Sequence, residues 1–175
     1  MTESLMEQLS RLQLGESGDK IHLQYKDEHR LATQCLAQQS RRSLAIFTYD
    51  LDPYVYDQAD FLDAVKQLAI ASQLSKIRVL LQNNDRVQKQ GHRLLEMARR
   101  LSSKIEIRRP KTDYLNYLEN FLVVDATGYV KRGVYHRYDG EVCFACRLEA
   151  VKYENFFNEV WECSEPDSDL RRLYL

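Results

Sequence analysis

One stretch decides the fold of this chain: Tyr117-Leu-Glu-Asn-Phe-Leu-Val-Val-Asp-Ala-Thr-Gly-Tyr-Val-Lys-Arg-Gly-Val134. It contains a short apolar run, residues 121–124, which ends at an Asp-Ala-Thr-Gly turn and is followed by a second run rich in β-forming residues. An uninterrupted apolar run that is bounded by turn residues is typical of a buried strand. We therefore predict a central strand that turns directly into its neighbour in the sheet.

Upstream of this stretch, predicted strands alternate with predicted helices. Strands are predicted at residues 43–49, 77–81 and 104–108, and apolar residues at helical spacing predict helices at about 57–69 and 85–101. Such alternation is typical of βαβ units with right-handed crossovers. After Gly128 we expect strands joined by a hairpin-type turn, and then an aromatic-faced helix over residues 153–163. The predicted fold class is α/β, a mainly parallel mixed sheet flanked by helices.

The 175 residues suit one compact domain, and the composition is ordinary for a soluble globular protein. Residues 1–19 are predicted to form an N-terminal amphipathic helix and linker, residues 20–163 the α/β domain, and residues 164–175 a C-terminal tail. Neither a secretory signal nor a run of about 20 apolar residues is present. We expect a cytoplasmic protein without a membrane partner.

Four cysteines are present, and Cys143-Phe-Ala-Cys146 has the spacing that zinc ribbons and redox motifs use. A zinc site would need a second pair, which the sequence lacks. Residues 141–148 are predicted as a strand, in which positions three apart point to opposite faces. We therefore expect two buried or half-buried thiols, with metal binding or redox chemistry as the alternative. We expect no metal ion or other cofactor.

Charge is spread unevenly along the chain. The formal net charge is −1, but residues 76–137 contain 14 Lys and Arg against 6 Asp and Glu, and the remainder contains 11 against 20. A basic middle section between acidic ends is typical of a surface that attracts anions. The same pattern fits two solvated surfaces or self-association, so it leaves phosphate and nucleic acid as candidates without selecting them.

The order of these elements resembles one half of a phospholipase D-like phosphodiesterase over about residues 20–163. In that family, His-x-Lys-x-x-x-x-Asp leads into the active-site strand. Here Leu118 stands at the place of the His and Asn120 at the place of the Lys, and only Asp125 fits. Lys131-Arg-Gly133 stands where the family has a Gly-Ser pair. Residues 46–53 and 91–95 are also similar to uncharacterised bacterial proteins that carry this module.

The resemblance implies a module that has lost its family's chemistry. Family members use a His nucleophile, a second His as general acid, and lysines that hold the phosphate, and one active site needs two motifs. Leu118 cannot form a bond to phosphorus, and Asn120 cannot make the charge-assisted bond of a Lys. We therefore expect no catalytic residues, and we expect a homodimer because the family pairs two halves. A divergent hydrolase that uses His92 or His136 is a third hypothesis.

A ligand crevice is expected where the strands of an open α/β sheet end. Polar residues follow the predicted strands at these ends: Asp50, Asp52, Asn83, Asn84, Asp85, Arg108, Arg109, and Asn120 of the central strand. The aspartates would repel a phosphate unless a metal or the arginines offset them. The alternative interpretation makes Asp57 and Asp85 helix caps and Asp52-Pro53 a turn.

A second candidate surface combines basic and aromatic residues: Arg108, Arg109, Lys111, Tyr114, Tyr117, Lys131, Arg132, Tyr135, His136, Arg137 and Tyr138. Basic side chains hold a nucleic-acid backbone while aromatic rings stack on bases, which suits RNA or single-stranded DNA. Tyr and Arg also dominate protein interfaces. We therefore predict a binding module for nucleic acid or a phosphoryl ligand, with a protein-interaction or regulatory adaptor as the alternative.

Overall fold

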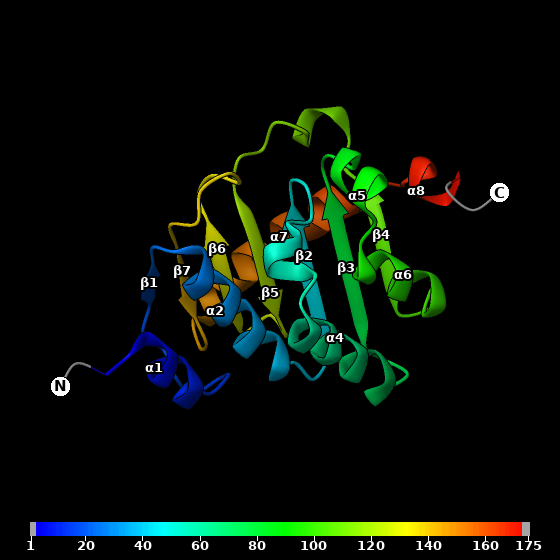
Figure 1. Cartoon of the computed structure of the whole chain (residues 1–175). Helices are drawn as coiled ribbons and strands as arrows, with labels where there is room; N and C mark the ends of the chain where they lie inside the picture. Colours follow the sequence, from blue (N-terminus) through cyan, green and yellow to red (C-terminus); the bar gives the residue numbers. More distant parts are fainter. Residues whose placement is uncertain (1–2, 173–175) are drawn as a thin grey trace.

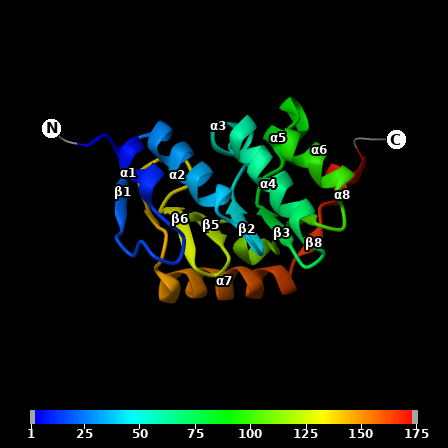
Figure 2. The same ribbon diagram turned by 90° about the horizontal axis from the view of Figure 1, so that it is seen from below.

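The structure, a computed structural model, describes residues 3–172 as one layered α/β domain (Figures 1 and 2). The ends of the predicted N-terminal segment and tail, residues 1–2 and 173–175, lie outside the described residues. The described strands are β1 (Ile21–Leu23), β2 (Ser43–Thr48), β3 (Lys76–Leu81), β4 (Ile105–Arg109), β5 (Asn120–Val124), β6 (Gly128–Arg132), β7 (Gly140–Cys143) and β8 (Glu165–Pro166). The helices are α1 (Leu5–Arg11), α2 (Lys26–Gln38), α3 (Pro53–Tyr56), α4 (Ala59–Ala71), α5 (Asp85–Gln90), α6 (Arg93–Arg100), α7 (Arg147–Glu162) and α8 (Ser168–Arg172), with a 3-10 turn η1 (Thr112–Tyr114).

The strands form one mixed sheet in the order β1-β7-β6-β5-β2-β3-β4-β8. The predicted α/β class and the buried central strand are confirmed, but the sheet is not mainly parallel. Only β2 with β3 and β3 with β4 pair in parallel, and the other pairings within the described residues are antiparallel. The reason lies in the connections. The link after β4 stays at one edge of the sheet, so β5 starts there and runs back, and the hairpins that follow can only add antiparallel neighbours.

Helices cover both faces of the sheet. Figure 2 shows α7 alone along one face, with α1 to α6 on the other. Because side chains alternate along a strand, β2 sends Leu44 and Ile46 into the core beneath α2 and α4, and Ala45 and Phe47 into a second, aromatic core beneath α7. The second core contains Phe157 and Trp161 of α7, which explains the aromatic pattern predicted for this segment.

The segment predicted as one helix over residues 85–101 is two helices. Gly91, at φ 73°, ends α5, and His92 begins α6 by accepting the Leu94 N–H at its Nδ1, 3.1 Å away. A Cβ on Gly91 would meet no atom within 4 Å, so this glycine is needed for its backbone conformation and not for close packing on the sheet. The periodicity of apolar residues continues across the break, which is why it suggested a single helix.

Both ends of the described chain pack onto the domain. Leu9 of α1 is fully buried, as expected for a docked helix, and α1 begins with a capping box between Ser4 and Glu7. Within the predicted tail, β8 adds an edge strand beside β4. Asp167 accepts the Asn84 amide at 2.9 Å and fixes the turn into α8. Between residues 3 and 172, no helix has the length and apolar character that crossing a membrane requires.

Candidate functional site

The carboxyl ends of β2, β3 and β4 lie at one edge of the sheet, together with the start of β5 and the end of β6. We call this the carboxyl edge. It is the edge where the sequence predicts a crevice, and most of the predicted polar residues follow strands there. Asp85 begins α5 and is exposed, and Asn84 binds Asp167, so both have structural roles at the edge.

Five polar side chains gather at the carboxyl edge, and we call them the polar cluster: Thr48, Asp52, Asn120 and Arg132, which are buried, and Tyr138, which is half-buried. The Tyr138 hydroxyl donates to Asp52 Oδ2 at 2.6 Å, and an Arg132 Nη lies 3.6 Å from the same oxygen. Asp52 Oδ1 accepts the Tyr54 N–H at 3.0 Å and so caps α3. Asp52 is therefore both a helix cap, as the alternative interpretation of this edge allows, and the partner of a buried cation.

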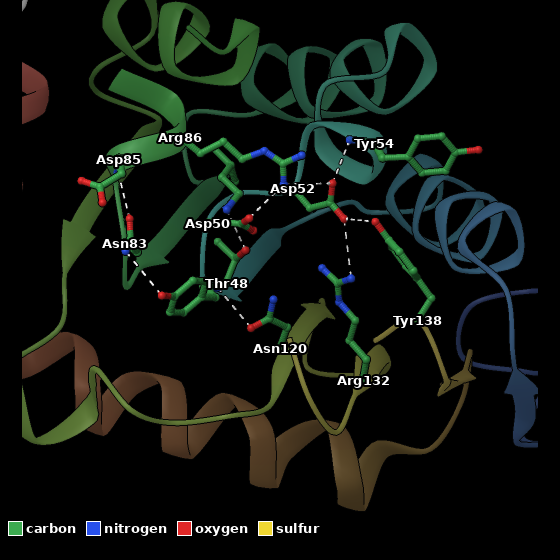
Figure 3. Close-up of polar contacts among 12 residues, drawn as sticks. Thr48, Asp50, Asp52, Tyr54, Asn83, Asp85, Arg86, Asn120, Arg132 and Tyr138 are labelled. Carbon is green, nitrogen blue, oxygen red and sulfur yellow. Dashed lines mark hydrogen bonds and ion pairs between the residues drawn. The ribbon is translucent and has the colours of Figure 1, made fainter. Parts of the chain in front are cut away.

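Asn120 and Arg132 face each other across β5 and β6 and are 2% and 1% exposed. Asn120 Oδ1 accepts the Tyr49 N–H at 3.1 Å, but its Nδ2 has no hydrogen-bond partner among the described residues. The same holds for Arg132 Nε and one Arg132 Nη. Figure 3 shows the Arg132 guanidinium and the Asn120 amide reaching from neighbouring strands toward Asp50 and Asp52. The polar cluster thus holds buried donors in excess of acceptors.

Protonation in and around the polar cluster follows from burial. Burial and the nearby Arg132 charge lower the pKa of His29 to about 3, so its imidazole is neutral at pH 7. Burial raises the pKa of Tyr138 to about 12, and its hydrogen bond to Asp52 adds to this. Burial also raises the pKa of Tyr56 to about 12. None of these three groups changes charge near neutral pH, as a general base would.

Ion pairs continue from the polar cluster to the surface. An Nη of Arg86 lies 2.9 Å from Asp50 and 3.8 Å from Asp52, and the Arg86 side chain is 42% exposed. Tyr49 lies beside this group and stacks on Tyr135, with ring centroids 3.8 Å apart. The arginine therefore covers the acidic side of the cluster with a side chain that solvent reaches.

The three motif positions, Leu118, Asn120 and Asp125, have different structural roles. Leu118 is 54% exposed and lies in the link before β5. Asn120 belongs to the cluster. Asp125 lies at the opposite end of β5, where its carboxylate accepts the backbone N–H groups of Arg41, Arg42 and Ser43 at 2.8 to 2.9 Å. The motif residue that fits the family pattern therefore holds the start of β2.

The predicted basic and aromatic residues do not form one face. Tyr114 and Tyr117 pack against Phe156 in the aromatic core, and Arg132 is buried in the polar cluster. The guanidinium of Arg108 lies 4.3 Å from the Trp161 ring centroid and donates to Glu106.

The remaining members are also separated. The ammonium of Lys131 lies 5.5 Å from the Tyr153 ring centroid, Tyr135 stacks on Tyr49, and Arg137 pairs with Asp139 at 3.2 Å. Arg109, Lys111 and His136 are exposed. Arg109 and Lys111 line a hollow of about 360 Å³ at the end of β4.

The two histidines of the hydrolase hypothesis lie in different surroundings. His92 is buried as the cap of α6, and burial lowers its pKa. His136 is exposed and contacts the Tyr135 ring edge-on. Among residues 3–172, no three His, Cys, Asp or Glu side chains gather as a metal site would require.

The structure also corrects the expected free thiols, because Cys143 and Cys146 form a disulfide. The predicted strand over residues 141–148 ends at Cys143, and a bend at Phe144 and Ala145 turns the second cysteine back toward the first. Alternation along a strand therefore does not apply to this pair. Cys35 and Cys163 are free and half-buried.

Sequence reasoning missed Thr48 and Arg86 as parts of this site. It placed Tyr138 and Arg132 on the basic and aromatic surface, whereas both belong to the polar cluster. A usable signal was present for Arg132. Counting outward from the turn that pairs Val124 with Gly128 puts Arg132 opposite Asn120, a buried position in the central strand.

Comparisons with known proteins agree with this architecture. A family model described as a domain of unknown function, DUF7931, matches residues 25–173. None of the curated proteins matches the sequence. Among solved structures, TrmBL2, an archaeal chromatin protein whose structure shows a novel mode of DNA binding, matches with a TM-score of 0.64 and 17% identity. The match covers 84% of this chain and 52% of that one, so this chain spans about half the length of TrmBL2.

Two phospholipase D-like structures match over nearly their whole length. Nuc from Salmonella typhimurium, a phospholipase D family member, has a TM-score of 0.57 and 12% identity over 85% of this chain and 98% of its own. NucT from Helicobacter pylori has a TM-score of 0.57 and 9% identity over the same shares. The phospholipase D-like fold expected from the sequence is confirmed.

Proposed function

We propose that this chain, which belongs to the DUF7931 family, a domain of unknown function, is a non-catalytic phospholipase D-like module that binds a phosphoryl group at the polar cluster. The observation that carries the proposal is the set of buried donors without acceptors on Asn120 and Arg132. An unmatched buried donor costs about 1 to 3 kcal/mol, so such a set favours a ligand that brings oxygen atoms.

The absence of catalysis rests on the residues at the motif positions. Attack on phosphorus needs a nucleophile, and Leu118 has none. The imidazole of His29, whose ring centroid lies 6.4 Å from that of Tyr138, is buried and has a pKa of about 3, so it is a poor base and lacks the proton that a general acid at pH 7 would donate. We therefore expect that the first step of the phospholipase D reaction, the attack of a His nucleophile on phosphorus, does not take place in this protein.

Phosphoryl binding rests on the geometry of Arg132. One Nη of Arg132 lies 3.6 Å from Asp52, and the guanidinium carbon lies 4.9 Å from the Tyr138 ring centroid. The Nε and the other Nη have no hydrogen-bond partner among the described residues. Planar guanidinium donors suit paired phosphate oxygens, and the Asn120 amide adds a neutral donor beside them. Because Asp52 balances Arg132, we expect selection of a single phosphoryl group of low charge.

Entry requires Arg86 to leave Asp50 and Asp52. This ion pair involves a side chain that is 42% exposed, and pairs of this kind contribute little to stability. The movement is therefore inexpensive, and Arg86 can turn toward the ligand that it admits.

The test uses two substitutions of Asn120 that should change phosphate affinity in opposite directions. Asn120→Asp keeps an oxygen for the Tyr49 N–H but replaces the free donor by a carboxylate, so phosphate should bind at least about tenfold more weakly. Asn120→Lys restores the cation that the family has at this place and should strengthen binding. The measurement is calorimetric titration with inorganic phosphate and with dimethyl phosphate, and Asn116→Asp in the exposed link before β5 is the control.

Unchanged affinity in Asn120→Asp would overturn the binding site. The non-catalytic half of the proposal has a separate readout, hydrolysis of bis(p-nitrophenyl) phosphate. We expect no turnover. Turnover that is lost in His92→Ala or His136→Ala would support the divergent hydrolase instead.

Nucleic acid is a second candidate ligand, favoured by the fold that this chain shares with DNA-binding TrmBL2 and by exposed Arg109 and Lys111 at the carboxyl edge. Fluorescence polarisation with labelled single-stranded RNA and DNA should then show salt-sensitive binding that Arg109→Ala/Lys111→Ala removes. Arg100→Ala, on an exposed residue at the end of α6, is the control. Salt-insensitive capture of a protein would favour the adaptor.

A further inference from the structure

The disulfide between Cys143 and Cys146 lies outside the proposed site. Cys143 ends β7, which runs away from the carboxyl edge, and Cys146 is the residue before α7. Only the bend at Phe144 and Ala145 separates the two cysteines. The pair therefore closes a four-residue loop between a core strand and the helix that covers the aromatic core.

The two sulfurs differ in their access to solvent. Cys143 is fully buried within the aromatic core, whereas Cys146 is half-buried at the surface. Thiol–disulfide exchange needs a thiolate to approach one sulfur along the bond, so an incoming thiol can reach only Cys146. This asymmetry assigns the two cysteines different roles.

The surroundings of Cys146 favour a negatively charged sulfur. Cys146 is the N-cap of the 16-residue helix α7, and its side chain makes no capping hydrogen bond. Arg147 follows and is exposed, and Glu149, the acidic residue of the first turn, pairs with Lys20 at 2.9 Å. A helix N-terminus and a neighbouring cation both stabilise a thiolate.

The structure also provides for the reduced form. The Gly18 carbonyl oxygen lies 3.5 Å from Cys143 Sγ and 3.4 Å from Cys146 Sγ. A disulfide cannot donate to this oxygen, but either thiol can. Reduction therefore leaves the buried Cys143 with an acceptor already in place.

We propose that Cys143 and Cys146 are a redox-active pair that exchanges with small thiols of the glutathione class. In the oxidised protein, an external thiolate attacks Cys146 Sγ, a mixed disulfide forms, and Cys143 leaves as a thiolate that takes up a proton. A second thiol then attacks the sulfur of the external partner, which releases Cys146 and one molecule of external disulfide. Two external thiols are oxidised and one protein disulfide is reduced. In reverse, Cys146 is the attacking and Cys143 the resolving cysteine.

The test is equilibration of the full chain in buffers of graded reduced-to-oxidised glutathione ratio, followed by acid quenching, alkylation and mass spectrometry of each cysteine. We expect both thiols of the pair to appear together within the range that glutathione buffers, in protein that circular dichroism shows to be folded. Cys35 and Cys163 serve as internal controls that remain thiols. A pair that stays oxidised until the protein unfolds would overturn the proposal, and so would a pair that stays reduced under oxidised glutathione.

Single variants separate the roles of the two cysteines. Cys143→Ser should accumulate a mixed disulfide with glutathione at Cys146, because the resolving thiol is missing. Cys146→Ser should remain unmodified at Cys143, because that sulfur is buried. Equal modification of both variants would refute the asymmetry. Phosphate binding is measured at the other edge of the sheet, so failure of either proposal leaves the other intact.

Discussion

Arg132 and Asp52 form an ion pair across 3.6 Å at a place where both side chains are almost completely buried. Removing one member of such a pair leaves the other charge without compensation. We expect Asp52→Asn to lower the free energy of unfolding by about 3 kcal/mol. Asp52→Asn/Arg132→Gln should lose less than the sum of the two single substitutions, which urea denaturation of Asp52→Asn, Arg132→Gln and the double variant measures. Strictly additive losses would contradict the pairing.

Stability should depend on pH through His29. Its pKa is about 3 in the folded protein and ordinarily 6.5, so the unfolded chain binds more protons between these values. The contribution is fully present above pH 6.5 and is lost as the pH falls toward 3, at up to about 1.4 kcal/mol per pH unit. His29→Gln should flatten the dependence of stability on pH in that window. A slope unchanged by the substitution would contradict this assignment.

Gly140 lies where β7 meets β6 most closely. A Cβ at this position would lie 2.0 Å from the Lys131 carbonyl oxygen, and backbone atoms cannot move aside easily. We expect Gly140→Ala to destabilise the protein by about 2 to 4 kcal/mol. Gly133→Ala is the matched control, since a Cβ there meets no atom within 4 Å. Equal melting temperatures for the two variants would show that the strands are not packed as described.

The homodimer expected from the phospholipase D-like resemblance remains a prediction. If two chains complete one site, as two halves do in that family, phosphate should promote association. Sedimentation velocity at high micromolar concentration, with and without phosphate, measures this. A monomer under both conditions would remove the expectation.

The sequence allowed most strands and helices to be predicted, because buried strands such as β2 and β5 are short apolar runs between turn residues. The edge strand β8 lies in the segment predicted as a tail. It did not reveal the break at Gly91, since the apolar spacing continues on both sides of it. The share of parallel pairings in the sheet was overestimated. The direction of β5 depends on the link after β4, and the sequence of that link has no periodic pattern that indicates it.

The candidate site was predictable in part. Asp52 and Asn120 follow from their positions at strand ends. Arg132 was expected on the surface because composition cannot distinguish an exposed cation from one that a distant carboxylate compensates. Tyr114, Tyr117 and Arg108 were expected at a ligand for the same reason, whereas their partners Phe156 and Trp161 lie 39 to 53 residues later in the chain.

Side chains of β5 and its turn hold β2 at both of its ends. Asn120 accepts the Tyr49 N–H just beyond the last residue of β2, and Asp125 accepts the Ser43 N–H at its first. A slip of one residue between the two strands would misplace both acceptors at once, so the five-residue spacing of Asn120 and Asp125 works as a gauge of strand register. Two side chains five residues apart therefore set the alignment of the two strands at the centre of the sheet.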